Sequence, residues 1–176
     1  MGLKVLKQIL YKGEKMSFKS QLSNFLDDCE KLIILGVGNE LKCDDGVGPY
    51  IIKKLKEENI EDNKKFLFID AKTVPENFTG KIRKEKPTHL IIVDACLMDG
   101  KPGDMKIVNK YDFADIGIST HSMSLSFFVR YLEKDTEFGI IFVGIEPESM
   151  DYADKPTPKV EEAANEFVKI LKEIIL

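Results

Sequence analysis

Two adjacent acids, Asp44 and Asp45, lie in a glycine-rich loop that could form a ligand site. The loop follows an apolar run, residues 32–37, that predicts a buried strand, and it precedes a helical pattern over residues 47–58. Such glycines are typical of nucleotide-binding loops, but Leu41 replaces the third glycine of a dinucleotide fingerprint, and the Gly-Lys-Ser/Thr of a P-loop is absent. Carboxylates at a helix N-terminus repel phosphate, and the helix dipole favours their ionised form. The loop therefore favours a cation, with nucleotide binding as the weaker alternative.

A third acid, Asp94, ends another apolar run, residues 90–95, which also predicts a buried strand. If the two strands are neighbours, about 4.8 Å apart, Asp45 and Asp94 share one pocket at their carboxyl ends. The alternative is that Asp94 only caps the loop that follows it. Two buried strands that both lead into acids favour the shared pocket.

The chain contains two histidines, His89 and His121. His121 lies in a polar stretch before a predicted helix, and by itself it fits an exposed side chain or a local hydrogen bond. Together with Asp45 and Asp94 it supplies two oxygen ligands and one nitrogen ligand, a set that suits a first-row divalent metal with positions left for water or substrate. His89 begins a predicted strand and is expected on the surface.

The three cysteines, Cys29, Cys43 and Cys96, form no CxxC pair and are odd in number. A disulfide framework is therefore not expected, and a reducing cytoplasm is the predicted location. Cys43 and Cys96 lie close in sequence to the acids, but both are interpreted as small buried apolar side chains. No Gly-x-Ser-x-Gly, HExxH or Cys/His nucleophile pattern is present.

Strand patterns alternate with helical patterns along the chain, which predicts a three-layer α/β fold. We expect a mostly parallel sheet of about five strands with helices on both faces. The chain is divided into a helical extension, residues 1–31, and one domain, residues 32–176. A last helix is predicted to begin at Pro158 with Thr157 as its cap. The expected strands cover residues 32–37, 66–69, 90–95, 105–108 and 140–145, and the short strand 105–108 is a candidate edge strand. The other expected helices cover residues 18–29, with Ser17 as a candidate cap, 47–58 and 123–132.

The charge pattern and the lengths of the apolar runs argue against nucleic-acid and membrane partners. The net charge of −4 comes from acidic and basic residues mixed along the chain, so no basic face for nucleic acid is expected. No apolar run approaches the ~18 residues that a membrane helix requires. The sequence thus predicts neither nucleic-acid binding nor membrane insertion.

A series of short segments resembles the hydrogenase maturation endopeptidases in content and order. The glycine-rich acid loop alone is moderately specific for that family, whereas the ordered set is highly specific. Pro75-Glu76-Asn77 and Pro87-Thr88 are similar to the branch that serves formate-hydrogenlyase-type hydrogenases. The segments are the acid loop 36–48, then Leu90-Ile91-Ile92-Val93-Asp94-Ala95, Pro102-Gly103, Ser119-Thr120-His121, Gly144-Ile145-Glu146-Pro147 and Thr157-Pro158.

The resemblance implies a metal-dependent, aspartyl-type peptidase domain over residues 32–176. Its metal ligands would be Asp45, Asp94 and His121, and Asp45 stands where many family members have glutamate, which is one methylene longer. The substrate would be the precursor of a nickel-containing hydrogenase large subunit, which loses a C-terminal extension after nickel insertion. Nickel would arrive with the substrate, and cadmium or zinc could replace it in vitro.

In this interpretation Asp45 and Asp94 are also the catalytic groups, because an ionised carboxylate can orient a water molecule or accept its proton. Asp44 would instead hold the loop or bond the first-turn amides of the following helix, and its loss would cost about 1 kcal/mol if it is a cap. The alternative function is that of a non-enzymatic, nickel-binding maturation chaperone with the same three ligands.

Overall fold

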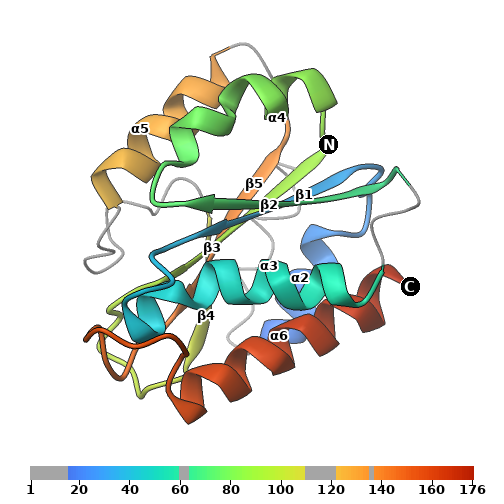
Figure 1. The fold of residues 1–176 in the computed structure, drawn as a ribbon. Helices are drawn as coiled ribbons and strands as arrows, with labels where there is room; N and C mark the ends of the chain where they lie inside the picture. The colour runs from blue at the N-terminus through green and yellow to red at the C-terminus, as the bar shows by residue number, and fades with distance from the viewer. Residues whose placement is uncertain (1–15, 60–63, 110–121, 135–136) are drawn as a thin grey trace.

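The computed structural model describes residues 16–59, 64–109, 122–134 and 137–176. Within these ranges the chain forms a five-stranded sheet between two layers of helices (Figure 1). This confirms the predicted three-layer α/β fold. The elements in chain order are α2 (Phe18–Phe25), β1 (Leu32–Val37), η1 (Cys43–Gly46), α3 (Val47–Glu57), β2 (Phe66–Lys72), η3 (Pro75–Phe78), α4 (Thr79–Glu85), β3 (His89–Ala95), β4 (Met105–Asn109), α5 (Ser122–Glu133), β5 (Gly139–Ile145) and α6 (Pro158–Ile175).

The strands lie in the order β2-β1-β3-β5-β4. All neighbours are parallel except β4, which runs antiparallel to β5 at one edge of the sheet. The short strand expected near residue 105 is therefore confirmed as an edge strand. Because β1, β2, β3 and β5 point the same way, the loops that follow them gather at one edge, called here the carboxyl end of the sheet.

Alternating side chains of the central strands divide the core between the two faces of the sheet. Leu32 and Ile34 pack with buried residues of α2, α3 and α6, whereas Ile33 and Leu35 pack with those of α4 and α5. Figure 1 shows the same division, with α4 and α5 on one side of the sheet and α2, α3 and α6 on the other. Complete burial of each aliphatic side chain contributes about 1.5–3 kcal/mol, so both layers are firmly attached to the sheet.

Helix α2 belongs to this core although it precedes the first strand. Ser17 caps it, as predicted, by accepting a hydrogen bond from the Ser20 N–H at 3.1 Å. Leu22 and Leu26 are buried in the cluster that contains α3 and α6. The domain boundary at residue 31 stays a prediction, and residues 1–15 lie outside the described ranges. None of the described helices has the length and apolar character to cross a bilayer.

The prediction that His89 lies on the surface is wrong, because its residue is only 7% exposed. The Phe25 ring of α2 packs edge-on against the imidazole, with the ring centroids 4.8 Å apart. The hydroxyl of Thr88 lies 3.0 Å from Nδ1, and a carboxylate oxygen of Asp28 lies 3.3 Å from Nε2. A strand start is normally exposed, but here α2 covers it. The buried histidine therefore helps to attach the N-terminal helix to the sheet.

Candidate active site

The glycines of the acid loop bring the start of α3 onto the backbones of β1 and β3. A Cβ atom on Gly48 would lie 2.2 Å from the Val37 carbonyl oxygen and 2.7 Å from that of Val93. A Cβ atom on Gly38 would lie 1.8 Å from the Asp45 carbonyl oxygen, and Gly38 has a φ of +143°, which favours glycine. Close packing of backbone on backbone thus accounts for these glycines without a bound phosphate.

Asp45 lies in the 3₁₀ turn η1, between β1 and α3, and is only 3% exposed. The N–H of Asn39 donates to its Oδ2 at 3.2 Å, and the N–H of Asp45 itself donates to the Lys42 carbonyl at 2.9 Å. The η1 turn also contacts β3. The carboxylate is therefore held in a fixed loop at the carboxyl end of the sheet, directly beside the strand that carries Asp94.

Asp94 is fully buried near the end of β3, where it pairs with Gly144 of β5. Its β-strand position places it on the same face of the sheet as Ile92, which packs with α4 and α5. A Cβ atom on Gly144 would lie 3.0 Å from the Met98 sulfur and 3.2 Å from the Cys96 Cβ, so the glycine keeps this crowded neighbourhood open. Since β1 and β3 are neighbours, the condition for a pocket shared by Asp45 and Asp94 is met, and the shared pocket itself stays a prediction.

Asp44 is fully buried and points to a different part of the chain. Its Oδ2 accepts the N–H groups of Glu148 and Ser149 at 2.8 and 2.9 Å, and its Oδ1 accepts the N–H of Thr157 at 2.6 Å. The alternative that it bonds the first turn of α3 is therefore wrong, since Gly46 caps that helix without a side chain. Asp44 does hold a loop, as expected, but the loop is residues 148–157.

The same contact corrects the expected role of Thr157. It stands at the N-cap of α6 and Pro158 follows as predicted, but its side chain makes no capping bond. Its hydroxyl instead lies 3.0 and 2.9 Å from the two Asp44 oxygens and donates to that carboxylate. A buried carboxylate needs donors more than an exposed helix end, whose amides water can satisfy.

Glu146 is a buried acid to which the sequence analysis assigned no role. It follows β5, and its Oε2 accepts the N–H groups of Met98 and Gly100 at 2.6 and 3.3 Å. Its backbone carbonyl accepts the Gly103 N–H at 2.9 Å. Glu146 thus closes the loop after β3 and fixes the chain just beyond Asp94. The apolar strand that runs into Glu146-Pro147 was the signal that could have identified it.

The cysteines near the acids are not reactive groups. Cys43 and Cys96 are buried, as predicted, and all three cysteines are free. Burial, followed by the negative charges of Asp94 and Glu146, raises the pKa of Cys96 to about 12. Burial and the Asp44 charge likewise raise the pKa of Cys43. The raised pKa values favour the protonated thiols at neutral pH, which disfavours nucleophilic attack by sulfur.

The third predicted ligand, His121, lies outside the described residues. Among the residues that the structure does describe, no group of three or more His, Cys, Asp or Glu side chains is arranged to hold a metal ion. The metal set Asp45, Asp94 and His121 therefore stays a prediction. The first described residue after His121 is Ser122, which begins α5, and α5 packs on the face of the sheet that Asp94 shares.

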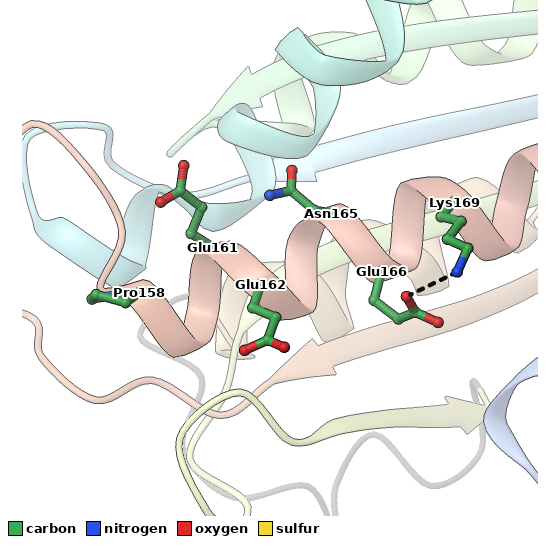
Figure 2. A pocket seen from close by; sticks show the side chains of 6 residues that line it. All are labelled: Pro158, Glu161, Glu162, Asn165, Glu166 and Lys169. Atoms are coloured by element: carbon green, nitrogen blue, oxygen red, sulfur yellow. Dashed lines mark ion pairs between the residues drawn. The ribbon is translucent and has the colours of Figure 1, made fainter.

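A surface hollow of about 390 Å³ lies along α6 (Figure 2), and Asp44, Asp45, Asp94 and Glu146 are not among its lining residues. Acidic residues and Asn165 line it, and Glu166 and Lys169 form an ion pair there at 4.0 Å. Its side chains come from one exposed helix face and do not converge on a common point (Figure 2). We therefore assign the candidate site to the carboxyl end of the sheet.

Known proteins resemble this chain in sequence and in fold. A putative hydrogenase maturation protease of Methanocaldococcus jannaschii is 39% identical over 89% of this chain and 95% of its own length. The hydrogenase 3 maturation protease of Escherichia coli K12 is 33% identical over 74% of this chain and 82% of its own. The crystal structure of the [NiFe] hydrogenase maturation protease HycI from Thermococcus kodakarensis superposes with a TM-score of 0.79, at 26% identity, over 88% of this chain and 98% of that one.

The family model HycI, described as hydrogenase maturation protease, matches residues 49–174. This range begins just after the acid loop and includes β3, β5 and α6. The match covers most of the chain, and the fold and the relatives agree with it. The chain belongs to the hydrogenase maturation protease family.

Proposed function

We propose that this protein is an endopeptidase that removes the C-terminal extension of a nickel-containing hydrogenase large-subunit precursor after nickel insertion. The observation that carries the proposal is a pair of buried acids on two neighbouring parallel strands of a maturation protease fold: Asp45 lies in the turn that follows β1, and Asp94 lies near the end of β3. The predicted cytoplasmic location belongs to the same proposal.

In this proposal Asp45, Asp94 and His121 bind the nickel that the substrate carries. Two carboxylates and one imidazole suit a first-row divalent metal, so Cd²⁺ or Zn²⁺ can replace Ni²⁺ in vitro. Two facts support this ligand set. The Asn39 amide restrains the Asp45 carboxylate, and α5, which starts next to His121 in the sequence, packs on the Asp94 face. Three ligands alone bind weakly, which makes nickel a sign that the substrate is mature.

The catalytic step needs a polarised peptide carbonyl and an activated water molecule. Metal held at the scissile bond would polarise the carbonyl. Asp45 or Asp94, if ionised, would orient the water and accept its proton. Burial of both acids keeps bulk water away, and a charge acts more strongly in such surroundings than in solvent.

The test is mass spectrometry of a nickel-loaded large-subunit precursor incubated with and without the protein. We expect the precursor to lose the mass of its C-terminal extension, and the nickel-free precursor to stay intact. If the precursor binds nickel-dependently but keeps its full mass, the protein is a maturation chaperone and the peptidase proposal is wrong.

A further inference from the structure

Each loop that follows a parallel strand exposes one large apolar side chain. Leu41 follows β1 and is 66% exposed, and Val74 follows β2 and is 38% exposed. Leu97 follows β3 and is 51% exposed, and Tyr152 follows β5 and is 84% exposed. These four residues, called here the apolar rim, lie at the carboxyl end of the sheet, where the candidate active site lies.

The exposed large apolar side chains are concentrated in the apolar rim. Single exposed apolar residues are common on proteins and need no explanation. Among the described residues, however, the other large apolar side chains with comparable exposure are only Phe127 and Tyr131 on α5 and Leu176 at the chain end. The rim therefore contains most of the exposed large apolar side chains in that part of the chain and places one beside each parallel strand.

Backbone hydrogen bonds fix the loops that carry two of the rim residues, Leu41 and Tyr152. The Cys43 N–H donates to the Ala153 carbonyl at 3.0 Å, and the Ala153 N–H donates to the Leu41 carbonyl at 3.1 Å. These bonds join the loop of Leu41 to the loop of Tyr152. Asp44 holds both ends of the second loop through Glu148, Ser149 and Thr157. Exposure of Tyr152 is thus a fixed feature of the fold and not a consequence of loose chain.

We propose that the apolar rim docks an apolar stretch of the substrate protein next to the bond that is cleaved, and that Asp44 is a positioning residue for it. The loops from β2 to β5 span three strand spacings, about 14 Å, which matches about four residues of extended chain. A small polar ligand would leave most of this edge uncovered, whereas a polypeptide with apolar side chains would cover it. Leu41 lies in the same loop as Asp45, and Leu97 follows the strand that carries Asp94, so a docked chain lies next to both acids. This inference rests on the proposed function.

Steady-state kinetics with the nickel-loaded precursor tests the docking. Tyr152→Ala and Leu41→Ala are each expected to raise KM about tenfold and to leave kcat within about twofold, because a contact made equally in the ground and transition states is lost. Melting temperatures should not change, since both side chains are exposed. Tyr152→Phe should retain the wild-type KM, because the proposed contact is apolar. A KM raised equally by Tyr152→Phe would contradict it.

Matched controls lie elsewhere on the surface. Phe127→Ala and Leu176→Ala remove side chains that are 73% and 77% exposed, and both variants should behave as wild type. If wild type cleaves the precursor and both rim variants retain its KM, the docking inference is wrong while the proposed function stands. If wild type fails to cleave, both are wrong. Sedimentation that finds a dimer dissolved by Tyr152→Ala would assign the rim to a second copy of this chain and also overturn the inference.

Discussion

The two ends of the sheet both contain buried polar groups, but they use them differently. At the amino end, the Thr88 hydroxyl accepts the N–H groups of Glu30 and Lys31, both at 3.0 Å, and contacts buried His89. These contacts attach the segment after α2 to the sheet. At the carboxyl end, Asp44 and Glu146 likewise attach loops, since each accepts hydrogen bonds from at least two backbone N–H groups.

Asp45 and Asp94 are buried at this same end of the sheet. Burial alone therefore does not identify a catalytic carboxylate, because all four acids are buried. The difference lies in the contacts: Asp44 and Glu146 each accept N–H groups from residues at least 46 positions away in the sequence, whereas Asp45 accepts the N–H of Asn39 in its own loop and Asp94 lies near the end of β3. Variants that separate these two kinds of acid, and the two ends of the sheet, test the comparison directly.

The largest expected effect is on catalysis. Asp45→Asn should lower the processing rate of the nickel-loaded precursor at least a hundredfold, roughly the value of a general base, while the protein stays folded. The measurement is the precursor-to-mature mass shift over time, with a thermal melt of the same sample. Asp45→Asn with wild-type activity would remove Asp45 from the site.

Asp44→Asn should have the opposite profile. An asparagine here has no charge, and its NH₂ group would meet N–H and O–H donors that the carboxylate now accepts: the N–H groups of Glu148, Ser149 and Thr157 and the Thr157 hydroxyl. We therefore expect a loss of about 3 kcal/mol in unfolding free energy. This exceeds the ~1 kcal/mol expected for a helix cap, because the carboxylate is buried and holds loop 148–157. Denaturant unfolding measures the loss. Well below the melting temperature, Asp44→Asn should still cleave with a kcat near wild type. If Asp44→Asn is stably folded but inactive, Asp44 and not Asp45 is the catalytic acid.

Variants of the two histidines should differ in nickel affinity. His121→Ala should weaken Ni²⁺ binding by more than about a hundredfold, since even residues behind a ligand cost ten- to a hundredfold. His89→Gln should leave nickel affinity unchanged and lower the melting temperature. Calorimetry with Ni²⁺, and with Cd²⁺ as a second probe, measures both. Equal affinity in wild type and His121→Ala would exclude His121 as a ligand.

The smallest expected effect is a pH dependence at the amino end. Burial lowers the pKa of His89 below its ordinary value of 6.5, and the nearby Asp28 charge opposes the shift. The unfolded chain then binds the proton more readily than the folded one, so stability is lost as pH falls below about 6.5. Melting temperatures between pH 7.5 and 5 should decrease, and Asp28→Asn should enlarge the decrease. A flat profile in both proteins would mean that His89 titrates as an exposed histidine.

Local sequence patterns predicted the elements well where one short segment carries all the information. The apolar runs before Gly38 and Glu146 and through Asp94 became central strands, and Ser17 caps α2 as its position predicted. The lone strand at residues 105–109 was also identified as an edge strand. Asp45 and Asp94 also lie at the carboxyl end of the sheet, as their positions after apolar runs indicated, because the period and polarity of a strand are properties of adjacent residues.

By itself, then, the sequence determined the elements, their layering and the end of the sheet where the acids gather. Only the tertiary structure decided which distant groups the structural acids hold. Asp44 bonds residues 104 to 113 positions further along the chain, and the same carboxylate takes Thr157 away from its helix. His89 is buried because a helix from earlier in the chain packs over it. Such contacts depend on how the elements pack, and the local hydrophobic period of the sequence does not predict which distant donor will bond a buried charge.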